Sequence, residues 1–146
     1  MTKHIYADNA ATTKMSPKVL ESMMPYLTEA YGNPSSLYST GAQAKKAVET
    51  ARAEIAECIG ADTNEIYFTS GGSESDNWAV KGVAHALYKK GKKHIITSAF
   101  EHHAVLHTVA ALEKEGFTAT YLDVHANGLV RPEDLEAAIR PDTALV

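Results

Sequence analysis

Residues 69–77, Thr-Ser-Gly-Gly-Ser-Glu-Ser-Asp-Asn, combine features that suit an anion. Gly71 and Gly72 let the backbone approach a ligand closely, and the nearby serines add hydroxyl donors. A helix predicted to begin near Ser73 adds free N–H groups and a positive dipole end, which together favour a phosphate. No Gly-Lys-Ser/Thr follows, so triphosphate hydrolysis is disfavoured. An ordinary strand-to-helix turn with serine capping explains the same residues, and spacing does not exclude it.

A second candidate lies in residues 98–103, Ser-Ala-Phe-Glu-His-His. His102 falls at a predicted helix start, where the helix dipole disfavours the charged imidazolium. A neutral imidazole facing a cleft can stack on an aromatic ligand or move a proton. His103 and His107 are four apart and share a helix face, but zinc needs a third ligand and none is evident. We expect no metal site and expect His102 and His103 to point to different sites; a plain capping or surface pair is the alternative.

Alternating apolar runs and helical periodicities must position these residues. Ser16-Pro17 predicts a helix start, Pro25 a kink or split in that helix, and Gly60 the end of a second helix with its apolar stripe over 44–58. Helices are further predicted over 73–90, over 101–115 and from 132, and strands over 66–69, 94–97, 118–124 and from 144. This order predicts an α/β fold, a mostly parallel sheet between helices in three α-β-α layers, with ligands at the carboxyl ends of the strands.

Composition excludes several classes of function. The 146 residues carry a formal net charge of −4, which argues against a nucleic-acid interface. No apolar run approaches the ~18–20 residues that span a bilayer, and the N-terminus lacks the apolar stretch of a signal peptide. One cysteine excludes an internal disulfide framework. The default expectation is a cytoplasmic protein without nucleic-acid or membrane partners.

Four blocks of the sequence, in order, resemble the NifS/IscS-type cysteine desulfurases. They are Tyr6–Thr13 (YADNAATT), Gly32–Ser36 (GNPSS), Phe68–Asn77 (FTSGGSESDN) and Glu101–Leu106 (EHHAVL). The resemblance runs the length of the chain. It implies the large domain of a fold-type I pyridoxal-phosphate enzyme of the class-V aminotransferase branch, with residues 1–15 as an N-terminal arm and 16–146 as an incomplete cofactor-binding domain.

The resemblance also implies roles for individual residues. Gly72 and Ser73 match the positions that hold the phosphate of pyridoxal 5'-phosphate, and His102 matches the histidine that stacks on its ring and acts in catalysis. Asn9, Ala10, Ala11 and Thr12 match a segment near the substrate entrance. His103 falls where the family varies, which suggests a bystander. The implied reaction takes sulfur from L-cysteine, leaving L-alanine and an enzyme persulfide, and passes it to sulfur-acceptor and iron–sulfur scaffold proteins. Family members are homodimers.

We expect the chain to be a fragment, inactive alone. The family's Schiff-base lysine, the aspartate at the ring nitrogen, the substrate-binding arginine and the nucleophilic cysteine are expected beyond Val146. Cys58 lies on the apolar stripe and Lys81 within the helix after the phosphate loop, and neither is expected to replace them. The alternatives are a non-catalytic phosphate-binding or dimerising module that acts with a partner, a selenocysteine lyase, or another class-V aminotransferase.

Overall fold

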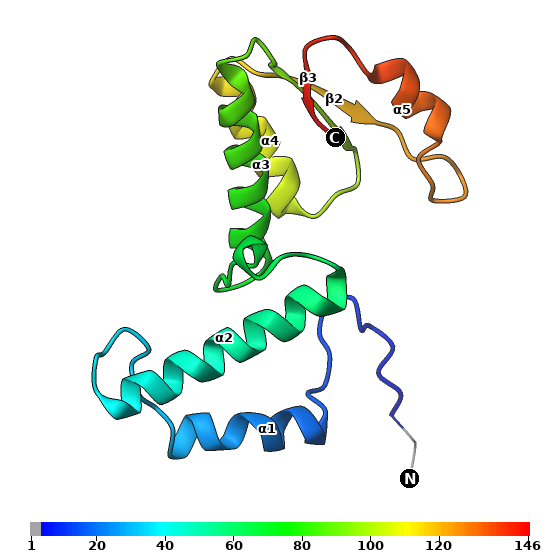
Figure 1. The fold of residues 1–146 in the computed structure, drawn as a ribbon. Helices are drawn as coiled ribbons and strands as arrows, with labels where there is room; N and C mark the ends of the chain where they lie inside the picture. The colour runs from blue at the N-terminus through cyan, green and yellow to red at the C-terminus, as the bar shows by residue number, and fades with distance from the viewer. Residues whose placement is uncertain (1–3) are drawn as a thin grey trace. The chain divides into compact units, whose positions relative to one another are not determined.

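The computed structural model describes residues 4–146. The chain divides into two compact units, and the boundary in the sequence falls between Tyr67 and Phe68. Figure 1 shows helices alone in the first unit and a sheet with helices in the second. Each unit is described by itself.

Over the described residues 4–67, the first unit contains two helices and one 3-10 turn. Helix α1 spans Pro17–Thr28, α2 spans Ser39–Ile59, and the turn η1 spans Thr63–Glu65. The Ser16 hydroxyl caps α1 by accepting from Val19 N at 3.2 Å, which confirms the predicted start. The helix continues through Pro25 rather than splitting there. Gly60 ends α2 in the left-handed conformation at φ 68°, as predicted.

The loop from Gly32 to Ser36 packs tightly against the start of α2. Asn33 accepts from Ser35 N through its side chain at 2.9 Å and from Ser36 N through its carbonyl at 3.0 Å, which folds the segment into a turn. A Cβ at Gly32 would collide with the Thr40 carbonyl, and a Cβ at Gly41 would lie 2.5 Å from the Ser36 carbonyl. The glycines are therefore needed for close backbone approach, and this motif is structural.

The second unit contains three parallel strands and three helices. Helix α3 spans Gly72–Tyr88, β1 His94–Ser98, α4 His103–Lys114, β2 Thr118–Leu122, α5 Pro132–Ala138 and β3 Thr143–Leu145. The strand order is β2-β1-β3, and every pair is parallel. The chain moves from β1 to β2 and then back past β1 to β3, so right-handed crossovers place α4 and α5 on opposite faces. Figure 1 shows this arrangement, which confirms the α/β class.

The core of this unit lies where α3 and α4 pack together against the sheet. Its buried members come from both helices, from β1 and from the turn before β2: Ala84, Ile95, Val109, Leu112 and Phe117. Ala84 and Leu112 are fully buried. Burial of these side chains fixes α3 against α4, and that packing brings the first turns of the two helices to the same side of the sheet.

His94 joins all three strands inside the sheet. Its side chain has no exposed surface, and its two ring nitrogens lie 2.9 Å from Thr143 Oγ1 on β3 and 2.8 Å from Thr120 Oγ1 on β2. Burial lowers the pKa of the His94 imidazole below its ordinary value; the charge of Arg140 adds to this shift and Asp142 opposes it. The histidine is thus a buried structural link that favours its neutral form.

One prediction about these elements is wrong. Residues 66–69 form no strand; the turn η1 and an irregular segment stand in its place. A strand needs a neighbour for its ladder, and residues 66–69 pair with none of the strands of the described sheet, β2-β1-β3. The stripe over 44–58 is helical, as predicted, although most of it is unburied: Ala44 is buried, whereas Ile55 and Cys58 are exposed. Helical spacing shows that these residues share a face but not that another element covers it.

Candidate functional site

The loop before α3 is held by its own side chains. Ser70 donates from its backbone N–H and its hydroxyl to Glu74 Oε2, at 2.7 and 2.8 Å. These two bonds, the backbone one first, hold the pKa of the Glu74 carboxyl below its ordinary value. The Thr69 hydroxyl lies 2.6 Å from that of Ser75. Asn77 Nδ2 donates to the Ser73 carbonyl at 2.9 Å, across the first turn of the helix.

Ser73 differs from the other hydroxyl-bearing residues of this loop. Residues 69–75 carry four hydroxyls, and those of Thr69, Ser70 and Ser75 are hydrogen-bonded within the loop. Within residues 4–146, the Ser73 hydroxyl makes no hydrogen bond, which leaves it available to a ligand. Glu74 and Ser75 therefore stabilise the loop, whereas the Ser73 hydroxyl is available to a ligand.

The N-terminus of α3 is open. Gly71 is the N-cap in extended backbone, and no side chain of the described residues caps the helix. The first N–H groups of a helix have no intrahelical partner, so those of Gly72 and Ser73 remain to bind an anion at the positive end of the dipole. A Cβ at either Gly71 or Gly72 would meet nothing within 4 Å, so the space beside the loop is free.

His102 occupies the N-cap of α4. Its backbone is extended, at φ −58° and ψ 147°, and its Nδ1 accepts from Ala104 N at 3.1 Å. An accepting Nδ1 carries no proton, so in the neutral ring the proton is on Nε2. The ring is therefore fixed at one edge by the helix and exposed at the other, as the predicted helix start implied.

Ser73 and His102 line one cavity in the groove between α3 and α4. Its volume is about 330 Å³, within the range of small-molecule sites. The lining includes Ser73, Asn77 and Lys81 from α3 and His102, His103 and His107 from the start of α4. The structure therefore brings the two predicted loops together, although the strand expected before the first loop is absent.

The expectation that His102 and His103 point to different sites is wrong. Two consecutive residues within a helix would differ by about 100° around its axis. His102 is instead extended, and its ring lies 6.2 Å from that of His103, between centroids. Both histidines line the cavity, so His103 is not separate from the site.

The sequence also offered a signal for the residues that were missed. Ser73, Asn77 and Lys81 are spaced by four and therefore lie on one face of α3. Lys81 lies two turns after Ser73 on that face, and the structure places it in the cavity wall. The sequence could not show that α4 packs beside this particular face, because that depends on the shared core.

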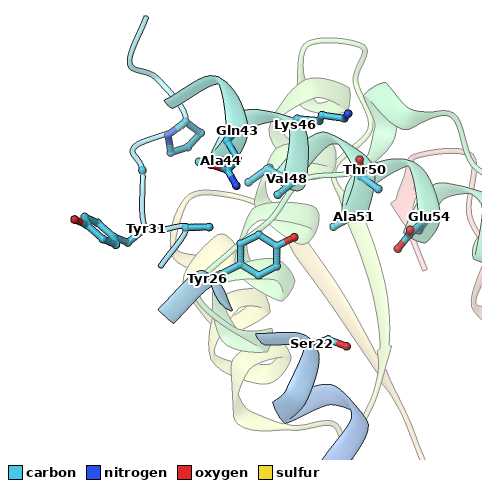
Figure 2. Close-up of a pocket in the computed structure, with 14 residues that line it drawn as sticks. Ser22, Tyr26, Tyr31, Gln43, Ala44, Lys46, Val48, Thr50, Ala51 and Glu54 are labelled. Atoms are coloured by element: carbon cyan, nitrogen blue, oxygen red, sulfur yellow. The ribbon is translucent and has the colours of Figure 1, made fainter. Parts of the chain in front are cut away.

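A larger hollow of about 840 Å³ lies in the first unit, between α1 and α2. Figure 2 shows Tyr26 of α1 and Ala44 and Val48 of α2 lining it, with Tyr31 at one end. None of the predicted site residues contributes to it. Size alone therefore does not identify the functional site.

The predicted entrance segment, residues 9–12, forms an exposed turn in the first unit. Ala11 N and Thr12 N donate to the Asp8 carbonyl at 3.1 and 3.4 Å. The Tyr6 hydroxyl donates to the same carbonyl at 2.8 Å and lies 2.5 Å from Thr12 Oγ1. The motif thus has a defined local fold, and its role at an entrance stays a prediction.

No group of three or more His, Cys, Asp or Glu side chains within residues 4–146 is placed to hold a metal ion. No helix in the same range has both the length and the apolarity needed to cross a bilayer.

Comparisons with known proteins agree with this geometry. The family model "Aminotransferase class-V" matches residues 5–146. "Cysteine desulfurase IscS" of Methanosarcina thermophila is 57% identical over 144 residues, which cover 99% of this chain and 35% of the relative. Its counterpart in Clostridium botulinum is 56% identical, over 100% of this chain and 36% of the relative.

Solved structures show the same likeness. A "NifS-like protein" superposes with a TM-score of 0.87 and 42% identity, covering 93% of this chain and 37% of that one. "SspA in complex with cysteine" gives a TM-score of 0.86 with 44% identity, over 94% of this chain and 40% of that one. The chain thus spans about a third of the length of the curated relatives it matches. With a family model covering residues 5–146, the chain belongs to the class-V aminotransferase family.

Proposed function

We propose that this chain forms the phosphate-binding and ring-stacking part of a pyridoxal-phosphate-dependent cysteine desulfurase. The observation that carries the proposal is the cavity that Ser73, beside the open N-terminus of α3, and the exposed His102 line together. The names of the similar proteins, "Cysteine desulfurase IscS" among them, support the choice of reaction.

The residues present fit the phosphate group of the cofactor. The backbone N–H groups of Gly72 and Ser73 and the Ser73 hydroxyl are three donors in one place, and the space beside the glycines is free. The Glu74 carboxylate keeps its negative charge, and the two hydrogen bonds from Ser70 hold it within the loop. A helix N-terminus with free backbone donors is a general solution for binding phosphate.

His102 would act on the reacting end of the same ligand. Its ring is oriented by the bond from Ala104 N, so it can lie against a flat heteroaromatic ring, and its Nε2 can hold or move a proton. Pyridoxal phosphate, when bound, supplies an electron sink for bonds to the substrate's Cα. Asn9, Ala10, Ala11 and Thr12 are proposed to line the approach of the substrate.

The proposed overall reaction concerns the parent protein. L-Cysteine transfers its sulfur atom to an enzyme thiol, so that the thiol becomes a persulfide and the substrate leaves as L-alanine. The thiol and the Schiff-base lysine are proposed to lie outside residues 1–146. Delivery of the sulfur to acceptor and iron–sulfur scaffold proteins, a homodimer, and a cytoplasmic location complete the proposal.

A binding experiment tests the part of the proposal that this chain carries. Pyridoxal phosphate and pyridoxal are titrated in parallel. The dissociation constant of pyridoxal divided by that of pyridoxal phosphate measures what the phosphate contributes. Ser73→Ala should reduce this ratio by roughly 10-fold or more, because a hydrogen bond to a charged group contributes about 1.5–3 kcal/mol. An unchanged ratio would refute a role for the Ser73 hydroxyl in binding the phosphate.

The reaction is tested in the parent protein. L-Cysteine is added to the cofactor-loaded enzyme, and alanine is quantified against a His102→Gln variant. Alanine formation that falls at least about 100-fold in the variant supports a catalytic role, since general acid–base groups contribute about 10²–10⁴-fold. Absence of alanine from the unmodified protein, with selenocysteine or another amino acid consumed instead, would assign a different member of the family.

A further inference from the structure

His103 and His107 form a pair that the proposed function does not use. They lie on successive turns of α4, and their rings are stacked with centroids 5.0 Å apart and planes 17° from parallel. Both side chains are exposed, and both line the cavity between α3 and α4. Within the described residues, neither ring makes a hydrogen bond, so their nitrogens are free to bind a ligand.

Two imidazoles at this spacing suit a divalent transition metal. Histidines at positions i and i+4 of a helix can bind one ion together, as they do in zinc enzymes. A metal–nitrogen bond of about 2.0–2.1 Å requires the two donor nitrogens to approach each other, and rotation of the exposed stacked rings permits this. Imidazole suits nickel, copper and zinc, whereas magnesium and calcium prefer oxygen ligands.

The remaining ligands of such an ion would be water. No third His, Cys, Asp or Glu among the described residues completes the site. His102 lies close by, but its Nδ1 is committed to Ala104 N. Lys81 lines the same cavity, and its positive charge weakens binding of a cation. These features describe an open site with two protein ligands rather than a closed structural one.

We infer that His103 and His107 together bind one divalent transition-metal ion at the mouth of the cavity. The inference does not depend on the proposed function, because it concerns the free rings of α4 alone. Family resemblance assigns no role to either residue. An ion bound here would bridge one turn of the helix, so metal binding should also stabilise the folded protein.

Nickel is the probe of choice, with untagged protein in a Cys58→Ser background. This background removes the single thiol of the chain, which is exposed and would compete for the metal. Calorimetry with Ni²⁺ should show one site. His103→Ala and His107→Ala should each weaken it at least about tenfold, since loss of even an outer-shell partner costs about 10- to 100-fold in metal affinity. His4→Ala, which removes an exposed histidine of the N-terminal segment, is the matched control.

Two further readouts locate the ion. Paramagnetic Ni²⁺ should broaden the imidazole resonances of His103 and His107 first. It should also raise the Tm of the background protein, but not that of the double variant that carries both His103→Ala and His107→Ala. Magnesium should do neither. Equal weakening by the two single variants with no effect of His4→Ala supports the site. Retention of the site in the double variant, or its loss in only one single variant, would overturn a shared two-histidine site.

Discussion

Replacing Gly72 by proline separates the backbone donor of the phosphate site from the fold around it. Gly72 is the first residue of α3, a position that proline favours because its N–H has no intrahelical partner. Gly71 before it has extended backbone, at φ 168° and ψ 177°, which suits a residue preceding proline. The substitution should therefore keep the helix while deleting one N–H donor.

The expected loss follows from one hydrogen bond. A bond to a charged group contributes about 1.5–3 kcal/mol, so Gly72→Pro should weaken pyridoxal phosphate binding by about 10- to 150-fold. Gly72→Ala is the matched control, because it retains the N–H and its Cβ would meet nothing within 4 Å. The control should bind within about threefold of the unmodified protein, an effect below about 0.7 kcal/mol.

The single tryptophan provides the assay. Trp78 follows Asn77 on α3, so its fluorescence should report a ligand at the start of the helix. Circular dichroism checks that the proline variant retains its helices. Equal affinities for the proline variant and the unmodified protein would refute a role for the Gly72 N–H. Equal losses in the proline and alanine variants would show that open space, rather than a donor, matters at this position.

Three further predictions concern the scaffold. Gly41→Ala should destabilise the protein by about 1–3 kcal/mol in urea unfolding, because its Cβ would lie 2.5 Å from the Ser36 carbonyl. The folded-state pKa of His94 is lowered, so the unfolded state is protonated first as the pH falls. The contribution of His94 to stability should therefore be complete above about pH 6.5 and decrease below it, by at most about 1.4 kcal/mol per pH unit. Urea unfolding of His94→Gln should lack this slope. Ser70→Ala should raise the pKa of Glu74 only part of the way to its ordinary value in an NMR titration, since the backbone donor at position 70 remains.

The start of α3 and three strands of a parallel sheet were predictable from the sequence, whereas the full extent of the sheet was not. The proposed phosphate site depends on the local backbone geometry of Gly71, Gly72 and Ser73, so a short motif contains most of what the proposal needs. The predicted strand over 66–69 failed because a strand depends on a distant neighbour, which the apolar residues themselves do not specify. The local geometry of the loop before α3 could therefore be predicted from the sequence, whereas the strand pairing of residues 66–69 could not.

The cavity shows the same limit in a different form. Helical spacing placed His103 and His107 on one face, and the structure confirms this with stacked rings. Spacing did not show that this face borders Lys81, because the groove exists only when α3 and α4 share a core. The residue-by-residue angle rule then misjudged His102, whose side chain caps the helix from outside it.

The division of hydrogen bonds within residues 69–75 explains why one serine matters more than its neighbours. Each loop hydroxyl that bonds within the loop lowers the freedom of the backbone before a ligand arrives, so less ordering is required on binding. The Ser73 hydroxyl makes no hydrogen bond among the described residues, so it adds nothing to that rigidity and stays available to a ligand. Substitution of Ser70 should therefore act through loop order and that of Ser73 through direct contact. The two effects are distinguishable because only the second depends on whether the ligand carries a phosphate.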